Sequence, residues 1–331
     1  MKTNYSELFE SFAKKKVLIV GDVMIDSYIW GKVDRISPEA PVPILSVEKR
    51  EDRLGGAANV ALNVQSLGAE ALLCSVIGED SNAELFIDLL HQHKLKSIGI
   101  VRDASRKTSK KTRVIGHHQQ LMRVDEEHTH PINSSIEAKL FEKIKEIASS
   151  ENIDIIVFED YDKGCISTQL IADVVAFSNE VAIPVVVDPK KRNFLSYKNV
   201  TLFKPNLKEL KEGLKLEFDA YDHQALIAAS KQLKDLLKAN AIMITLSEQG
   251  VLIMDDVSTK IIPAHIRNIA DVSGAGDTVI SVTALALAAG LSIQKAAALA
   301  NLAGGLVCEK VGVVPIEKAE LLNEAEKLEK D

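Results

Sequence analysis

Hydrophobic residues along the chain form two alternating kinds of segment. Short apolar runs are typical of strands buried on both faces, and longer stretches with apolar residues every three or four positions are typical of amphipathic helices. Val17–Gly21 (VLIVG) and Ile153–Phe158 (IDIIVF) are runs of the first kind, whereas Ala57–Leu67 and Ala83–Leu90 have helical spacing. This alternation indicates repeated strand–helix–strand units, so it predicts an α/β fold with a parallel sheet.

The same alternation continues along the chain. Further apolar runs predict strands at Ala71–Ile77, Val185–Asp188, Thr201–Phe203 and Ala241–Leu246. Ser134 and Glu137 stand three residues apart before an apolar stretch of helical period, which is the pattern of a capping box. We therefore predict that a helix begins there.

Two segments break the alternation. Tyr28–Val47, which contains three prolines, and Lys110–Val124 read as strands without an adjoining helix. We predict that they form a small separate sheet, with strands at about residues 27–48 and 110–125, which covers the main sheet as a lid. Because no Ser/Gly/Pro-rich linker and no long repeat interrupts the chain, a single domain over residues 1–331 is predicted.

The composition excludes several classes of protein. Of 331 residues, 46% are hydrophobic and 26% charged, and no apolar run is long enough to span a membrane. The net charge of −7 argues against a general nucleic-acid binder, which needs a basic face. Three widely spaced cysteines fit reduced thiols, and the N-terminus has no apolar signal segment, so a cytoplasmic protein is expected.

The stretch DVSGAGD (Asp271–Asp277) lies between a strand-like run and a long alanine-rich helical run. Glycines at 274 and 276 would let the backbone approach an anion, and the free N–H groups of a helix start would bind it. Asp277 beside such a hole could accept a proton from an attacking hydroxyl in phosphoryl transfer. The alternative is a plain helix cap, which is the commoner role of an isolated Gly-x-Gly-Asp.

Three weaker patterns accompany this stretch. Gly55 and Gly56 precede a helix that carries Asn59, an arrangement that permits close contact with a polyol. Asp22 and Asp26 follow the first predicted strand, where ligands of parallel sheets bind. No dinucleotide fingerprint stands at that turn, and the chain has no Walker A motif, so neither a Rossmann dehydrogenase nor a P-loop enzyme is indicated.

A third loop suggests a place for a metal ion. Asn206 and Glu209 open a predicted helix after the strand at 201–203 and lie one turn apart. An amide and a carboxylate so placed could hold hydrated magnesium beside nucleotide phosphates.

Together these residues resemble the ribokinase-like, or PfkB, family of sugar kinases over nearly the whole chain. Its two motif regions correspond to Gly55, Gly56 and Asn59 and to DVSGAGD, with Asn206–Glu209 between them. The resemblance implies a mostly parallel sheet between two helix layers and a β lid that often forms a homodimer. It also implies ATP and Mg²⁺, with Asp277 as catalytic base.

The resemblance assigns further residues by motif. It implies an anion hole at Gly274, Ala275 and Gly276, and phosphate and magnesium positions at Asn206 and Glu209. It implies nucleotide contacts at Thr245, Ser247, Gly250 and Asn301. It also implies a potassium ion held by Asp271 with backbone carbonyls near Gly312.

A closer resemblance is to the bacterial D-glycero-D-manno-heptose 7-phosphate kinases, which act in ADP-heptose and lipopolysaccharide synthesis. It rests on RISPEAPVPI (35–44), QQLMRVD (119–125), EDYDKG (159–164) and VDPK (187–190). Relatives usually have SDYAKG where this chain has EDYDKG. The substrate-binding residues implied here, together with the glycine–asparagine region, are Asp26, Gly55, Gly56, Asn59, Arg113, Gln120, Asp160, Lys163 and Lys190.

The expected reaction is phosphorylation of O1 of D-glycero-β-D-manno-heptose 7-phosphate by ATP. Many relatives of this kind are fused to a C-terminal nucleotidyltransferase, whereas this chain ends after a helix at about 316–330, so only the 1,7-bisphosphate is expected. Two alternatives stay open from the sequence. One is a kinase of the same fold for another sugar or sugar phosphate, such as ribose or fructose phosphate; the other is a binding protein without catalysis.

Overall fold

The main body of the chain is built on a nine-stranded sheet. The computed structural model describes residues 3–117, 119–265 and 267–328. The strand order is β13-β12-β11-β10-β9-β8-β1-β4-β5, and only β12 and β13 run antiparallel to their neighbours. The bounds are β1 Lys16–Gly21, β4 Glu70–Ile77, β5 Lys96–Arg102, β8 Ile155–Glu159, β9 Val185–Asp188, β10 Leu202–Phe203, β11 Ala241–Thr245, β12 Val251–Met254 and β13 Thr259–Ile262. The predicted mostly parallel sheet is confirmed.

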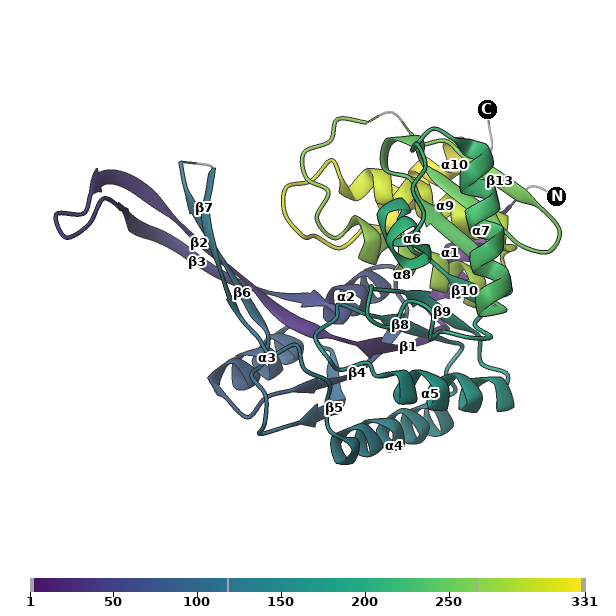
Figure 1. Cartoon of the computed structure of the whole chain (residues 1–331), viewed down its shortest axis with the longest axis horizontal. Helices are drawn as coiled ribbons and strands as arrows, with labels where there is room; N and C mark the ends of the chain where they lie inside the picture. The colour runs from purple at the N-terminus through teal and green to yellow at the C-terminus, as the bar shows by residue number, and fades with distance from the viewer. Residues whose placement is uncertain (1–2, 118, 266, 329–331) are drawn as a thin grey trace.

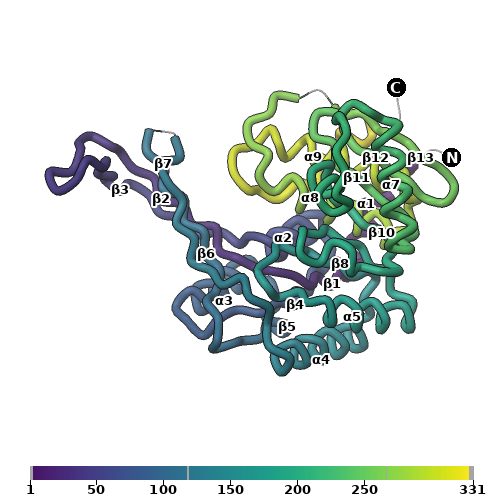
Figure 2. Tube along the Cα trace, in the orientation of Figure 1, coloured from purple at the N-terminus to yellow at the C-terminus, as the bar shows by residue number. Residues whose placement is uncertain are grey.

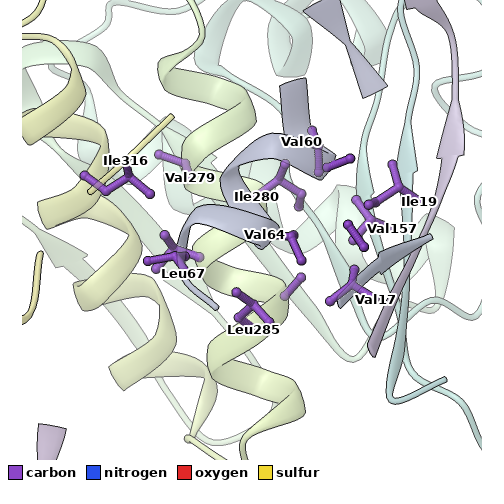
Figure 3. Packing of buried hydrophobic residues seen from close by; sticks show 14 of the residues in the cluster. Val17, Ile19, Val60, Val64, Leu67, Val157, Val279, Ile280, Leu285 and Ile316 are labelled. Atoms are coloured by element: carbon purple, nitrogen blue, oxygen red, sulfur yellow. The ribbon is translucent and has the colours of Figure 1, made fainter. Parts of the chain in front are cut away.

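Helices cover both faces of this sheet (Figure 1). One layer contains α1 Tyr5–Phe12, α2 Ala57–Ser66, α3 Ser81–Gln92, α8 Ala275–Ala288, α9 Ile293–Val307 and α10 Lys318–Leu328. The other contains α4 Ser134–Ser150, α5 Thr168–Glu180, α6 Leu207–Leu214 and α7 His223–Leu237. Alternate residues of β1 serve the two layers, since Val17 and Ile19 pack in the first core and Leu18 and Val20 in the second. Figure 3 shows the first core, where Val60 of α2 and Ile280 of α8 meet the strands.

The second sheet has four strands and extends away from the main body (Figures 1 and 2). Its order is β3-β2-β6-β7, with β2 Val23–Ile36, β3 Pro43–Gly56, β6 Lys110–Gly116 and β7 Gln119–Glu126. The predicted small sheet is therefore present, but β2 begins earlier than residue 27 and β3 ends later than residue 48. The physical reason is that Met24, Ile25 and Leu54 are buried where the sheet joins the body. Asp26 and Gly55 consequently lie on paired strands at this junction.

Local details of the helices differ in one place from the sequence pattern. The cap of α4 is Asn133, whose side-chain oxygen accepts from the N–H groups of Ser135 and Ile136. The predicted capping box of Ser134 and Glu137 is wrong by one position, because the Glu137 carboxylate instead accepts from the hydroxyl of Ser167. Across the described ranges, every helix is too short or too polar to cross a bilayer.

Candidate active site

Charged residues gather where the central strands end. Glu159 and Asp188 are the last residues of β8 and β9 and stand opposite each other in register. Lys204 follows β10 directly, and its Nζ lies 2.7 Å from Asp188 Oδ2 in a pair buried on both sides. The carboxyl edge of a parallel sheet is where ligands of such folds bind, and α8 begins at the same edge.

Asp277 lies in the first turn of α8 and faces two polar side chains. Its Oδ2 accepts from Nδ2 of Asn59 at 2.7 Å, and its Oδ1 accepts from the Tyr161 hydroxyl at 2.7 Å. The N-cap of α8 is Gly274, and no side chain caps this helix. The carboxylate of Asp277 therefore does not cap the helix, and the plain helix cap that the sequence left open as an alternative is wrong.

The protonation of Asp277 is set by two opposing effects. Burial raises the pKa of its carboxyl to about 6, while the hydrogen bonds from Asn59 and Tyr161 act in the opposite direction. The carboxyl group is consequently ionised at neutral pH, and its pKa lies only about one unit below that pH. A carboxylate with such a pKa suits a general base.

The first glycine of DVSGAGD is required by its backbone conformation and by a close approach, and the second lies next to a buried ion pair. Gly274 has φ +80°, and a Cβ there would lie 3.2 Å from Asn59 Nδ2. A Cβ at Gly276 would lie 3.6 Å from Asp188 Oδ2 and 3.9 Å from Lys204 Nζ. Among the described residues, the N–H groups of Gly276 and Asp277 have no hydrogen-bond partner. Free donors, a helix N-terminus and a buried lysine thus converge at one point, which suits a phosphoryl group.

Asp22 holds the loop that supplies Tyr161. Its carboxylate accepts from the backbone N–H groups of Tyr161, Lys163 and Cys165, at 2.9 to 3.0 Å. Its own carbonyl accepts from the N–H of Ala57, the first residue of α2. One buried side chain therefore fixes Tyr161 relative to the helix that carries Asn59.

Four predicted substrate residues, Asp26, Arg113, Gly55 and Gly56, lie at the junction of the two sheets. Asp26 Oδ1 lies 2.6 Å from Nη1 of Arg113. A Cβ at Gly55 would lie 2.3 Å from Asp26 Oδ2, so only glycine fits beside this carboxylate. Gly56 has φ +61°, and a Cβ there would lie 2.4 Å from the carbonyl oxygen of Asp22.

Other predicted substrate residues lie elsewhere. Asp160 is buried and its oxygens accept from Tyr197, Asn193 and the N–H of Asp162, so it faces inward rather than toward a ligand. Gln120 is exposed near the start of β7 and pairs with Ile115, near the end of β6 that lies away from the junction with the main body. The Nζ of Lys163 pairs with Glu127 at 2.7 Å.

Asn206 and Glu209 form a capping box at the start of α6. Each side chain accepts from the backbone N–H of the other at 2.8 Å, and Glu209 Oε1 also lies 2.7 Å from Lys190 Nζ. The predicted substrate residue Lys190 thus lies beside the predicted metal residues. Its ammonium group also lies over the ring of Tyr161. No cluster of three or more metal-ligating side chains occurs within the described ranges. A carboxylate such as that of Glu209 is the kind of group that binds a hydrated magnesium ion through water.

An open cleft of ≈ 970 Å³ lies next to this capping box. Its lining includes three predicted nucleotide residues, Asn206, Thr245 and Ser247, and lysines of α6 and the following loop. Gly250 closes the loop with φ +93°, where a Cβ would meet the carbonyl oxygen of Ile262. Asn301 of α9 donates to the carbonyl oxygen of Pro263 at 2.8 Å.

Asp271 joins the two loops predicted to hold potassium. Its Oδ2 accepts from the N–H of Gly312 at 3.0 Å and its Oδ1 from the N–H of Ser273 at 2.9 Å. Although burial acts to raise the pKa of Asp271, these backbone donors lower it below its usual value. The carboxylate is thus negatively charged, as a cation ligand must be.

Several site residues escaped the sequence analysis. The sequence pattern assigns no role to Lys204, and Tyr161, Asp188 and Glu159 occur in it only as members of motifs. Burial, with Asp188 and Asp277 nearby, raises the pKa of Glu159 well above its usual value. The rule that loops after parallel strands hold the ligands would have found three of them, since Glu159, Asp188 and Lys204 end or follow such strands.

Comparison with known proteins places this geometry in context. Residues 14–319 match the family model of the pfkB family carbohydrate kinases. Among curated relatives, the bifunctional protein HldE of Methylobacillus flagellatus is 41% identical over 308 residues, which are 93% of this chain and 62% of the relative. HldE of Geobacter metallireducens is 39% identical over 325 residues, 97% of this chain and 65% of the relative. The chain thus spans less than two thirds of the length of these relatives.

Solved structures with the same fold are more distant in sequence. Phosphofructokinase-2 from Escherichia coli, in complex with potassium, superposes with a TM-score of 0.80 at 20% identity, over 95% of this chain and 99% of the other. Ribokinase from Arabidopsis thaliana, complexed with ribose and ATP, gives a TM-score of 0.71 at 16% identity, over 93% and 98% of the two chains. At these identities the likeness establishes the ribokinase-like fold.

Proposed function

The chain belongs to the pfkB family of carbohydrate kinases, and on that premise we propose that it phosphorylates O1 of D-glycero-β-D-manno-heptose 7-phosphate with ATP. The heptose is suggested by the HldE relatives at 36 to 41% identity, because the part of them that this chain matches is the carbohydrate-kinase part. The observation that supports the chemistry best is the buried Asp277 between Asn59 and Tyr161, beside free N–H groups of α8.

In this proposal Asp277 is the general base. Its carboxylate takes the proton of the sugar hydroxyl as the oxygen attacks the γ-phosphorus, and the bond from that phosphorus to the leaving oxygen of ADP breaks. Asn59 and Tyr161 hold the carboxylate in one orientation by a hydrogen bond to each oxygen. The carboxylate of Asp277 is thus oriented before the substrate binds.

The first turn of α8 stabilises the migrating phosphoryl group. Charge on its three outer oxygens would be met by the free N–H groups of Gly276 and Asp277 and by the positive end of the helix. Lys204, next to Gly276, supplies a fixed positive charge in a buried setting where charge interactions are strong.

The nucleotide would occupy the cleft lined by Asn206, Thr245 and Ser247, with its phosphates directed toward α8. Magnesium, when bound with ATP, neutralises phosphate charge. Glu209 and Asp188 would hold it through water, and Lys190 would stay near the phosphates because it is tied to Glu209. The carboxylate of Asp271 beside Gly312 fits a potassium ion that stabilises the DVSGAGD loop.

We also propose that two copies associate through their small sheets. Outside the body, this sheet exposes apolar side chains, among them Val47, Leu121, Met122 and Val124. Four strands with one unpacked apolar region rarely remain alone in water, so a second copy is the natural partner.

A panel of acceptor sugars tests the proposal. With ATP and Mg²⁺, release of ADP should be fastest with D-glycero-D-manno-heptose 7-phosphate, and the product should carry its new phosphate at C1. Fructose 6-phosphate and ribose are the comparison substrates. Higher kcat/KM for either one would reject the heptose and leave a pfkB kinase for that other sugar.

A further inference from the structure

The proximal part of the small sheet has one face of unusual charge. Residues paired directly across strands lie on the same face, so the register from Asp26 to Trp30 places eight charged side chains together. Five are basic and three are acidic, although the whole chain has a net charge of −7. They are Lys49, Arg53, Lys111, Arg113 and Arg123, with Asp26, Glu51 and Asp125. A local positive excess on an acidic protein attracts an anion.

This face is turned toward the candidate active site. Nη1 of Arg53 lies 3.4 Å from the carbonyl oxygen of Val313 and 2.9 Å from where a Cβ of Gly312 would stand. Gly312 in turn donates to Asp271 at the start of the DVSGAGD loop. Arg53 therefore reaches from the small sheet across the opening of the site to the loop beside α8.

Two guanidinium groups of this face share one aromatic support. The Cζ atoms of Arg53 and Arg113 lie 5.0 and 5.3 Å from the centre of the Tyr28 ring. Tyr28 is 7% exposed and stacks on Trp30 at 5.2 Å, so the support is itself fixed. Cation–π contacts with a buried ring hold both guanidinium planes in place.

Each arginine uses only part of its hydrogen-bonding capacity. Arg113 bonds Asp26 through Nη1, and Arg53 bonds Glu51 through Nε. Within the described ranges, Nη2 of Arg53 and both Nε and Nη2 of Arg113 have no hydrogen-bond partner. The carboxylates thus position the two groups and leave their other N–H donors available.

We propose that Arg53 and Arg113 together bind the phosphate group already present on the acceptor, which makes the enzyme selective for phosphorylated sugars. This inference rests on the proposed kinase function and specifies its substrate class. Two planar forks match the oxygens of a phosphate dianion, whereas sugar hydroxyls need single donors and acceptors. Lys163 and Lys190 fit this role less well, since the only nitrogen of each side chain is paired with a carboxylate and offers no planar fork of donors.

Kinetics of the Arg53→Gln enzyme test the proposal. Charge-assisted bonds lost from one guanidinium should raise KM for heptose 7-phosphate about 10- to 100-fold, with kcat changed little. Arg53→Lys should recover part of the affinity, because it keeps the charge but not the fork. The matched control is Arg50→Gln, which removes the same charge from an exposed position on the opposite face of β3. Melting temperatures identify any variant that fails to fold.

The acceptor without its phosphate provides the second comparison. Arg53→Gln should leave kcat/KM for the unphosphorylated heptose unchanged within about twofold, because the lost contact is with the phosphate alone. Equal losses with both acceptors, or a fall in kcat without a rise in KM, would overturn the proposal. If wild-type enzyme prefers fructose 6-phosphate, the heptose assignment fails and the same comparison on that sugar tests Arg53. If it prefers ribose, the phosphate site is refuted and a sugar kinase remains.

Discussion

The carboxyl edge of the main sheet and the charged face of the small sheet both contribute to the site, but they hold their charges differently. At the main edge, Asp277 is 5% exposed and the Asp188–Lys204 side chains are 7% and 3% exposed. On the small sheet, the side chains of Arg53 and Arg113 are 28% and 22% exposed. Buried charges interact strongly with one another because little water screens them, whereas the interactions of partly exposed charges are weakened by water and salt.

This difference separates two tasks. The main edge lies on strands and helices packed on both faces, which suits the alignment of base and phosphoryl group to a fraction of an ångström. The small sheet packs against the body only at its proximal end, where its charged face meets the opening of the site. We infer that the main edge determines the reaction and the small sheet determines which sugar enters.

The largest expected effect comes from the base at the main edge. Asp277→Asn should lower kcat by about 10²- to 10⁴-fold, because the amide cannot accept the hydroxyl proton. Binding of ATP, followed by calorimetry, should persist. The control is Asp235→Asn on the surface of α7, which makes the same chemical change far from the site. Turnover of Asp277→Asn near the wild-type value would refute the assigned role.

Next in size is the buried ion pair. Lys204→Met leaves Asp188 buried without its cation, which should cost about 3–5 kcal/mol of unfolding free energy. An exposed pair of the small sheet serves as the contrast, since Arg123→Gln should cost less than about 1 kcal/mol. Urea denaturation measures both. Equal costs would abolish the distinction between the two regions.

A smaller effect is expected from the hydroxyl that bonds the base. In the wild type, kcat/KM should fall as the pH drops through about 6, because protonated Asp277 cannot accept a proton. Tyr161→Phe removes a hydrogen bond that favours the ionised form, so the pKa rises and this limb should move up by about one pH unit. An unmoved limb in this variant would show that another group titrates.

The smallest effect on catalysis concerns the outer part of the small sheet. Met122→Asp should convert the proposed dimer to a monomer, because a charge replaces an exposed apolar contact. Turnover at saturating substrate should change little, since the main edge is untouched. Sedimentation at micromolar concentration measures the mass. A dimer unaffected by the substitution places the interface elsewhere.

The fold was largely predictable because its signal is repeated. A strand whose alternate residues pack in two different cores appears in the sequence as a continuous apolar run. Val17 to Val20 are such a run, and similar runs recur along the main sheet. Boundaries were less predictable where tertiary packing decided them. Burial of Leu54 extends β3 to Gly56, and Ser167 takes the Glu137 carboxylate that the capping-box pattern assigned to the helix start.

The site was predictable only in part, because sequence does not say which way a loop residue faces. Asp160 and Tyr161 are neighbours, and the prediction selected Asp160 because its carboxylate suits hydroxyl groups. In the structure Asp160 faces Tyr197 in the core, whereas Tyr161 faces Asp277. The three hydrogen bonds by which the Asp22 carboxylate holds this loop, its clasp, are donated by backbone N–H groups. Backbone donors are the same for every residue type except proline, so the sequence does not reveal them.

That clasp has a consequence for how the loop can vary over evolutionary time. Asp22 contacts only the main chain of residues 161–165, so a change of side chain in the loop does not by itself remove these three hydrogen bonds. Asp162 adopts φ +56°, a conformation that aspartate tolerates better than most residues. The position of Tyr161 therefore does not depend on the neighbouring side chains of the loop. It depends on Asp22, whose replacement would remove three hydrogen bonds at once.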